Sequence, residues 1–173
     1  MAFDARHVYY DGKVQKSHGD VFRTIDPSTG NTLADIHSAN HADIDSAVAS
    51  GRDAFISWSS TPPIVRARIL HQAVHLLRKR NEEIAKLETS DTGKPFSETS
   101  TVDVVTGADV LEYFSALVAG GGLNGETIQL REDAWIYTKK EPLGVCAGIG
   151  AWNYPIQMYV FLSVLKLTAD TAN

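Results

Sequence analysis

The stretch that decides the fold is "GVCAGIGAWNYPIQ", residues 144–157. Its first seven residues are small and apolar on both faces, which is typical of a central parallel β-strand. Pro155 then marks the start of a helix, because proline is favoured at the first helical positions. The stretch therefore predicts the beginning of a βα unit, which needs further parallel strands beside it.

The glycines of this stretch do not complete a dinucleotide-binding fingerprint. Gly148 and Gly150 match the first two positions of G-x-G-x-x-G, but Asn153 stands where the third glycine or alanine belongs. No acidic residue follows at the usual distance to bind a ribose. Ligands of α/β sheets nevertheless bind at the carboxyl ends of the strands, so the turn after Gly150 is the candidate site.

Asn153 has two interpretations from its position alone. It can be the N-cap of the helix that begins near Pro155, a common role for asparagine. It can also be an amide donor to an oxyanion, a role that stabilises a transition state by about 3 kcal/mol in enzymes that use it.

The rest of the chain alternates between β and helical patterns. Residues 7–37 predict two β-hairpins, with turns at Asp11-Gly12 and over residues 26–30. Residues 41–120 predict three amphipathic helices. The second has Thr61 as N-cap and Pro62 at the first helical position, with one apolar stripe from Leu70 to Leu87. Residues 126–140 return to β character, with a turn near residues 132–133.

Composition excludes several function classes. The formal net charge of -5 and the isoelectric point near 5.6 argue against nucleic acid as a partner. The longest apolar run, around residues 158–167, is too short to span a membrane, and the polar N-terminus is unlike a signal peptide. A single cysteine suits a reducing compartment. We therefore expect a cytoplasmic protein.

Longer stretches carry a family resemblance. "FRTIDPSTGNTLADI", "RARILHQAVHLLRKRNEEIAKLETSDTGKPFSETSTVDVVTGADVLEYF", "YTKKEPLGV" and "GIGAWNYPIQ" occur in this order. Together they resemble the aldehyde dehydrogenase superfamily, and within it the betaine-aldehyde dehydrogenase branch, over about residues 7–157. The resemblance implies an α/β fold, the N-terminal portion of an aldehyde dehydrogenase. That portion has β-hairpins, three amphipathic helices, an arm hairpin and the first βα unit of a truncated Rossmann-like cofactor domain.

The same resemblance implies a division of the chain. Residues 1–143 would form the hairpins, the helices and the oligomerisation-arm hairpin. Residues 144–157 would form the first strand and turn of the NAD-binding domain. Residues 158–173 depart from the family pattern and are expected to be a divergent tail. The lysine that betaine-type members carry nine residues after the asparagine is Leu162 here.

Roles at the strand end are also carried over from the family. Gly150, Ala151 and Trp152 would contact the nicotinamide cofactor, NAD or NADP. Asn153 would hold the thiohemiacetal oxyanion. Tyr154 would be one wall of an aromatic box that holds a quaternary ammonium by cation–π contact, or would simply pack between helix and strand.

A potassium site is a further implication of the betaine-type resemblance. Its ligands map onto the backbone oxygens of Thr24 and Ile25 and onto the carboxylate of Asp91. Oxygen ligands suit a hard cation. The alternative is that Asp91 is an ordinary acid in the last turn of a helix and that Thr24 and Ile25 are plain strand.

Aldehyde oxidation needs a thiolate, a general base and bound NAD. The family places its cysteine and glutamate beyond the residues present here, and Cys146, inside the predicted strand, fits an inert thiol. We therefore expect an oxidoreductase by family that is inactive as this chain alone. The parent enzyme would be a homo-oligomer that oxidises betaine aldehyde or a related aminoaldehyde to the acid, in glycine betaine biosynthesis from choline.

Two other functions remain open from the sequence. One is a non-catalytic interaction module that docks on full-length aldehyde dehydrogenase subunits through its arm strands. The other is a small independent nucleotide-binding domain, which the missing glycine and acid disfavour.

Overall fold

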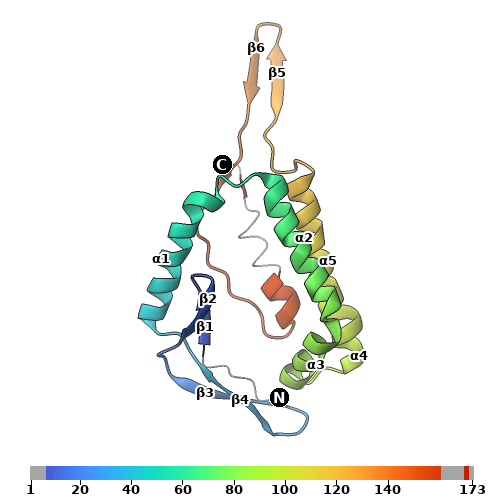
Figure 1. The fold of residues 1–173 in the computed structure, drawn as a ribbon. Helices are drawn as coiled ribbons and strands as arrows, with labels where there is room; N and C mark the ends of the chain where they lie inside the picture. The colour runs from blue at the N-terminus through green and yellow to red at the C-terminus, as the bar shows by residue number, and fades with distance from the viewer. Residues whose placement is uncertain (1–6, 161–169, 172–173) are drawn as a thin grey trace.

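The structure, a computed structural model of the 173-residue chain, describes residues 7–160 and 170–171. These residues form the mixed α/β arrangement that the sequence predicts (Figure 1). The strands are β1 (His7–Tyr10), β2 (Lys13–Lys16), β3 (Val21–Ile25), β4 (Thr32–His37), β5 (Thr127–Arg131), β6 (Ala134–Tyr137), β7 (Glu141–Pro142) and β8 (Asp170–Thr171). The helices are α1 (His41–Trp58), α2 (Pro63–Lys79), α3 (Asn81–Thr92), α4 (Phe96–Glu98), the π-helical turn η1 (Thr99–Asp103) and α5 (Val104–Ala119), and residues 155–160 are also helical.

The strands pair as antiparallel hairpins where the turn residues predict them. Asp11 and Gly12 both take positive φ, at 56° and 67°, as a two-residue hairpin turn with the right twist requires. In the β3–β4 turn the Asp26 carboxylate accepts from the Ser28 backbone N–H at 2.8 Å. The arm hairpin β5–β6 turns at residues 132–133, as predicted, and projects away from the helices (Figure 1).

The second predicted helix is in fact two helices. The apolar stripe from Leu70 to Leu87 is interrupted at Arg80, where α2 ends and α3 begins with backbone angles of -102° and 15°. Asn81, the first residue of α3, donates its side-chain N–H to the Ser100 carbonyl at 2.8 Å, which ties the break to η1. The predicted N-terminus was also wrong by one residue, since Pro62 occupies the cap position and Thr61 bonds to the preceding turn instead.

Residues 144–150 do not form the predicted strand. They pair with no other strand in the described part of the chain, and most of the segment is exposed, with Ile149 at 96%. A strand exists only where a neighbour accepts its backbone hydrogen bonds, and a parallel neighbour is absent from residues 7–160 and 170–171. The helix predicted after it does form, from residue 155.

The core lies between α2 and α5, which run side by side (Figure 1). Leu70 and Val74 of α2 pack with Leu111 of α5 and with Val160 from the last described helix. Burying each of these side chains contributes about 1.5–3 kcal/mol. Ser115 of α5 donates to the Ala67 carbonyl of α2 at 2.9 Å, so the pair is also joined by a buried hydrogen bond. The helix at residues 155–160 is therefore anchored in the core.

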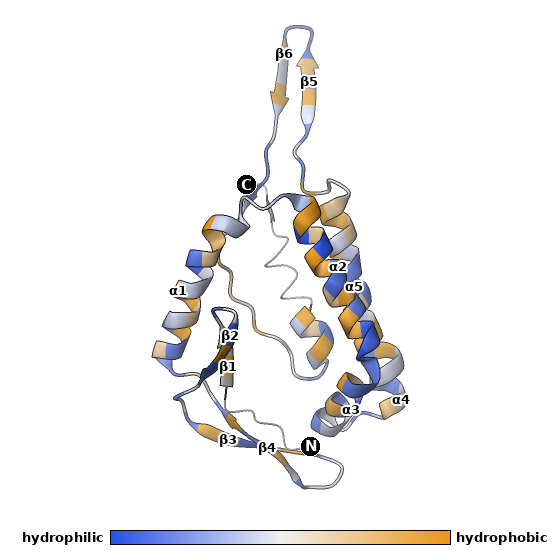
Figure 2. Ribbon diagram, viewed as in Figure 1, coloured by the Kyte–Doolittle hydropathy of each residue, from blue (hydrophilic) through white to orange (hydrophobic). Residues whose placement is uncertain are grey.

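Other surfaces keep apolar side chains in solvent. Along the arm hairpin, Ile128, Leu130 and Ile136 are exposed, and hydrophobic residues recur on both strands (Figure 2). No helix within the described residues is long and apolar enough to cross a membrane. Of the predicted divergent tail at 158–173, including Leu162, residues 161–169 and 172–173 lie outside the described residues.

Two glycines give a matched test of how the β3–β4 hairpin meets α3. Gly93 ends α3 with φ at 76°, and an added Cβ would lie 2.7 Å from Cγ of Pro27. Gly30 has a similar φ of 73° but open space around it. We expect Gly30→Ala to lower the free energy of unfolding by about 1–2 kcal/mol, the cost of a left-handed conformation. Gly93→Ala should cost clearly more, because the Pro27 ring must move. Urea unfolding measures the stability of both variants. Equal losses of stability would show that the contact between Gly93 and Pro27 does not hold the hairpin against α3.

Candidate functional site

A cavity of about 820 Å³ lies between the β3–β4 hairpin, α3 and residues 148–159. Its size is within the range of small-molecule sites. The three predicted cofactor residues, Gly150, Ala151 and Trp152, all line it, and so do Thr24 and Asp91. Most of the remaining wall is apolar: Leu33, Ala34, Ile36, Ile84, Leu87, Pro155 and Ile156. The predicted cofactor residues and two of the three predicted potassium residues therefore meet at one cavity, whereas Ile25, Asn153 and Tyr154 are not among its lining residues.

Asn153 is not the cap of the following helix. The backbone N–H of Met158 donates to the Tyr154 carbonyl at 3.0 Å, which makes Tyr154 the cap residue and puts Asn153 one position outside the helix. The Asn153 side chain is exposed and makes no hydrogen bond within the described residues. The N-cap interpretation is therefore wrong, and the amide is left available to a ligand.

Tyr154, next to it, is half-buried and held by its own chain. The ammonium of Lys94 lies 3.9 Å from the centre of the ring. The hydroxyl faces Asp103 and Thr106. The ring thus makes a cation–π contact of the predicted kind, but with a lysine of this chain rather than with a ligand.

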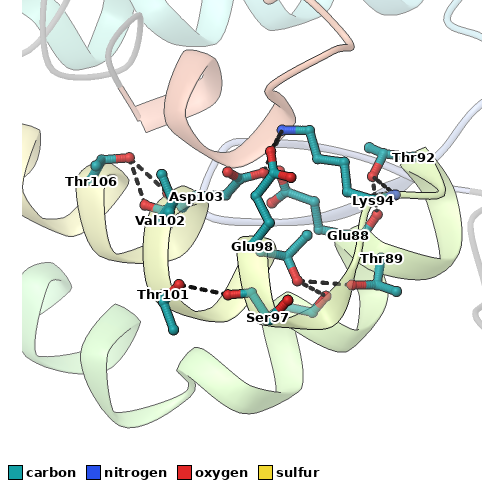
Figure 3. A network of polar contacts seen from close by, with 12 residues as sticks. Glu88, Thr89, Thr92, Lys94, Ser97, Glu98, Thr101, Val102, Asp103 and Thr106 are labelled. Atoms are coloured by element: carbon teal, nitrogen blue, oxygen red, sulfur yellow. Dashed lines mark hydrogen bonds and ion pairs between the residues drawn. The ribbon is translucent and has the colours of Figure 1, made fainter.

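Lys94 belongs to a buried charged cluster that we call the Lys94 cluster: Glu88 of α3, Lys94, and Asp103 of η1 (Figure 3). Lys94 Nζ lies 2.6 Å from Asp103 Oδ2 and 3.8 Å from a carboxylate oxygen of Glu98. Asp103 is fully buried and Glu88 is 5% exposed. Buried charges are expensive unless paired, so the Lys94–Asp103 pair is what makes this arrangement tolerable.

The cluster shifts the pKa of each member. Burial raises the pKa of Glu88, and with the neighbouring Asp103 brings it to about 7. Burial alone would raise the pKa of Asp103. Hydrogen bonds from Lys94, Tyr154 and Glu88 outweigh burial and hold this pKa below its usual range. The pKa of Lys94 is raised, because Asp103 outweighs the effect of burial. Near neutral pH the cluster therefore contains one ammonium, one carboxylate and one carboxyl close to its midpoint.

Two carboxyl oxygens of this cluster are buried without a normal hydrogen bond. They are Glu88 Oε1 and Asp103 Oδ1, and neither has a donor partner within the described residues. A buried acceptor left unpaired costs about 1–3 kcal/mol. A proton on Glu88 relieves this cost, because a carboxyl can donate to a carboxylate beside it.

Sequence reasoning missed the Lys94 cluster, although a signal was present. Glu88 follows Ile84 by four residues, and Asp103 precedes Gly107 by four, so both acids fall on apolar helix faces. Acidic residues on a buried face are rare unless they are paired. The lysine that pairs them directly follows Gly93, outside any helical pattern.

Two of the three predicted potassium residues are joined by a hydrogen bond. The Thr24 hydroxyl donates to Asp91 Oδ1 at 3.0 Å, which brings two of the three together through side chains. Ile25 follows Thr24 at the end of β3, and its side chain is exposed. No group of three or more His, Cys, Asp or Glu side chains that could hold a metal ion occurs within residues 7–160 and 170–171. The donors that are present are oxygens, which suit a hard cation.

Removing the lysine tests the energetics of the cluster. Lys94→Met leaves the Asp103 carboxylate buried without its cation, and we expect the free energy of unfolding to fall by about 3 kcal/mol or more. Lys86→Met is the matched control, since Lys86 pairs with Glu82 on the exposed face of α3 and should change stability little. Urea unfolding measures the loss of stability in both variants. Equally small losses would contradict a buried carboxylate at Asp103 that is paired with Lys94.

Comparison with known proteins agrees with this geometry. Residues 14–170 match the model of the aldehyde dehydrogenase family. The indole-3-acetaldehyde dehydrogenase AldA of P. syringae, a mutant in complex with NAD+ and IAA, is 32% identical with a TM-score of 0.87, over 96% of this chain and 34% of that one. The aldehyde dehydrogenase KauB from Pseudomonas aeruginosa is 29% identical with a TM-score of 0.86, over 95% of this chain and 33% of that one. The chain spans about a third of the length of these structures. It belongs to the aldehyde dehydrogenase family.

Proposed function

We propose that the chain is the N-terminal portion of an NAD-dependent aldehyde dehydrogenase, and that it supplies the turn at residues 150–154 to the site of oxidation. The observation that carries the proposal is the cavity lined by Gly150, Ala151 and Trp152, in a family whose solved members include NAD complexes. The proposed units are residues 1–143, with hairpins, helices and arm, residues 144–157, entering the cofactor domain, and residues 158–173, a divergent tail.

The residues present fit a bound nicotinamide at this cavity. Gly150 has no side chain, and Ala151 has only a methyl group, so a ligand can approach their backbone groups closely. The apolar wall would exclude water from one side of the ring. When bound, NAD accepts the hydride from the substrate. The chain's own part is to bind and orient this group.

Asn153 is proposed to act on the substrate. Its amide is exposed and unpaired among the described residues, so no internal hydrogen bond must be broken before it donates. An amide N–H aimed at the aldehyde oxygen stabilises the negative charge that develops when a thiolate attacks. Such a donor contributes to turnover more than to substrate affinity, because the charge is absent in the ground state.

The substrate we favour is betaine aldehyde or a related aminoaldehyde. The supporting observation is Tyr154, whose ring already has one cation, the Lys94 ammonium, 3.9 Å from its centre. Lys94 takes one face of the ring, so a cationic substrate would use the other. The resemblance adds a potassium ion near Thr24, Ile25 and Asp91, whose oxygen donors are compatible with it.

Residues 1–173 are proposed to be inactive alone. Cys146 is the single cysteine of the sequence, and its half-buried Sγ lies 3.7 Å from the Gly144 carbonyl. A thiol directed at a neutral backbone oxygen gains no activation as a nucleophile. The nucleophile and the general base would come from a longer polypeptide.

The exposed arm favours a second role. Apolar side chains of β5 and β6 stand in solvent, and both strands have unpaired edges within the described residues. Such an edge can add to a sheet of another subunit. The arm would then serve homo-oligomer formation in the parent enzyme, or docking of this chain on full-length subunits.

The test is a chimera in which residues 1–157 continue into the corresponding later part of the P. syringae enzyme. Aldehyde oxidation should be restored in the chimera and be absent from the 173-residue chain, measured as NADH formation. Asn153→Ala in the chimera should lower turnover by about a hundredfold or more, the usual cost of one oxyanion donor. The Michaelis constant should change much less.

Stability is the control for Asn153. Because the residue lies outside the helix, its removal should leave the melting temperature of the chimera nearly unchanged. Undiminished turnover of Asn153→Ala in an active chimera would disprove the role of the amide. NADH formation by residues 1–173 alone would disprove the proposal that this chain is inactive without a longer polypeptide.

A further inference from the structure

The segment that carries Asn153 has little secondary structure to hold it. Residues 143–154 form no strand or helix, and Trp152 is 88% exposed. Upstream, the side chain of Val145 lies close to Gly51 of α1. Residues 147–153 are exposed, and burial resumes at Tyr154, Pro155 and Ile156. The contacts of residues 154–156 are therefore the nearest restraint on the position of the Asn153 amide.

Two sets of contacts reach residues 154–156. The first is apolar: Ile156 packs on the core, and α5 approaches so closely at Gly107 that an added Cβ would be 3.7 Å from Cα of Gln157. The second is polar and comes from the Lys94 cluster. Lys94 covers the Tyr154 ring, Asp103 faces its hydroxyl, and the Ile156 backbone N–H interacts with the Glu88 carboxyl.

We propose that Glu88, Lys94 and Asp103 are positioning residues that fix the turn at residues 153–156 and so aim the Asn153 amide. They come from α3, from the loop after it and from η1, so together they restrain the ring, the hydroxyl and the backbone of the turn. The apolar contacts fix the helix at 155–160 against the core between α2 and α5. The Lys94 cluster fixes the orientation of the first residues of this helix. That the aimed amide serves an aldehyde rests on the proposed function, whereas the restraint of the turn does not.

A consequence is that the turn responds to protonation of Glu88. The charged groups acting on Glu88 are Asp103 of η1 and Lys94 of the loop after α3; Tyr154 faces Asp103, and Glu98 of α4 lies 3.8 Å from Lys94 Nζ. With Glu88 neutral, one ammonium balances one buried carboxylate. Ionisation adds a second buried negative charge beside Asp103 and weakens the pairing that holds the turn. Because the pKa of Glu88 is raised, this strain is absent in acid and sets in as the pH rises through about 7.

The first test is hydrogen exchange of the full 173-residue chain. The reporter is the backbone N–H of Met158, which donates to the Tyr154 carbonyl. Lys94→Met should speed its exchange about tenfold or more relative to amides of α2. Lys94→Arg should restore protection, because a guanidinium also pairs with carboxylates and stacks on aromatic rings. Lys86→Met, altered on the exposed face of α3, is the matched control.

A second measurement applies if Lys94→Met unfolds the whole chain. In a background of Trp58→Phe and Trp135→Phe, the remaining Trp152 lines the same cavity as Glu88. Its fluorescence should change with a midpoint near pH 7, and Glu88→Gln should remove the transition. Glu98→Gln, at the exposed edge of the cluster, should keep it.

Neither measurement uses NAD or an aldehyde, so the outcome is independent of the proposed function. Unchanged protection of Met158 in a folded Lys94→Met chain would overturn the positioning role. So would a Trp152 signal with no transition, or with the same transition in Glu88→Gln. An inactive chimera with these results intact would instead count against the proposed function alone.

Discussion

The ion pair between Lys94 and the fully buried Asp103 is the interaction on which the rest of the site depends. Asp103 could not remain ionised at full burial without a cation at 2.6 Å. Once placed there, the ammonium also lies over Tyr154, which joins η1 to the turn before the last described helix. Glu88 then shares this environment and has its pKa raised to about 7. One pair of charges thus links α3 and η1, which are close in sequence, to the distant turn at Tyr154.

A second constraint is the number of surfaces without a partner. The core between α2 and α5 is closed by Val160, but α1, the arm hairpin and residues 144–152 leave apolar side chains in solvent. Exposed apolar surface of this extent is typical of interaction sites, which agrees with the proposed role of the arm. Coverage of about a third of the solved relatives' length agrees with this interpretation. The described residues contain a cavity and the turn at residues 150–154 beside it.

Much of the fold could be predicted from local sequence, because local chemistry determined it. Asp11-Gly12 dictates a hairpin turn through its positive φ values, and the apolar stripe of α5 ends at the glycines after Ala119. The family assignment was also reached from the sequence and is confirmed by the family match. The predictions failed where the secondary structure depends on a contact with a residue far away in the sequence. Residues 144–150 have strand character but no strand to pair with in the described part of the chain. The break at Arg80 is followed by a bond from Asn81 to η1, which no local pattern predicts.

The candidate site likewise contains residues that the sequence points to and residues that it does not. The cofactor role of residues 150–152 was taken from the family resemblance and remains a prediction, and the structure places all three residues at one cavity. The roles of Asn153, Tyr154 and the potassium residues remain predictions. Glu88, Lys94 and Asp103 were missed, since their importance comes from burial and from convergence of three elements. Hydrophobic periodicity describes single elements and contains no information on which charges meet.

The most direct measurement of the central claim is the proton NMR spectrum of the Lys94 side chain in the 173-residue chain. A methylene group beside an ammonium that lies 3.9 Å from the centre of the Tyr154 ring is shielded by the ring. The account predicts that the Cε protons of Lys94 resonate upfield of those of the other lysines, and that Tyr154→Leu abolishes this shift. Lys94 Cε protons at the position of an exposed lysine would contradict the account, because the ammonium would then not join Asp103 to the turn.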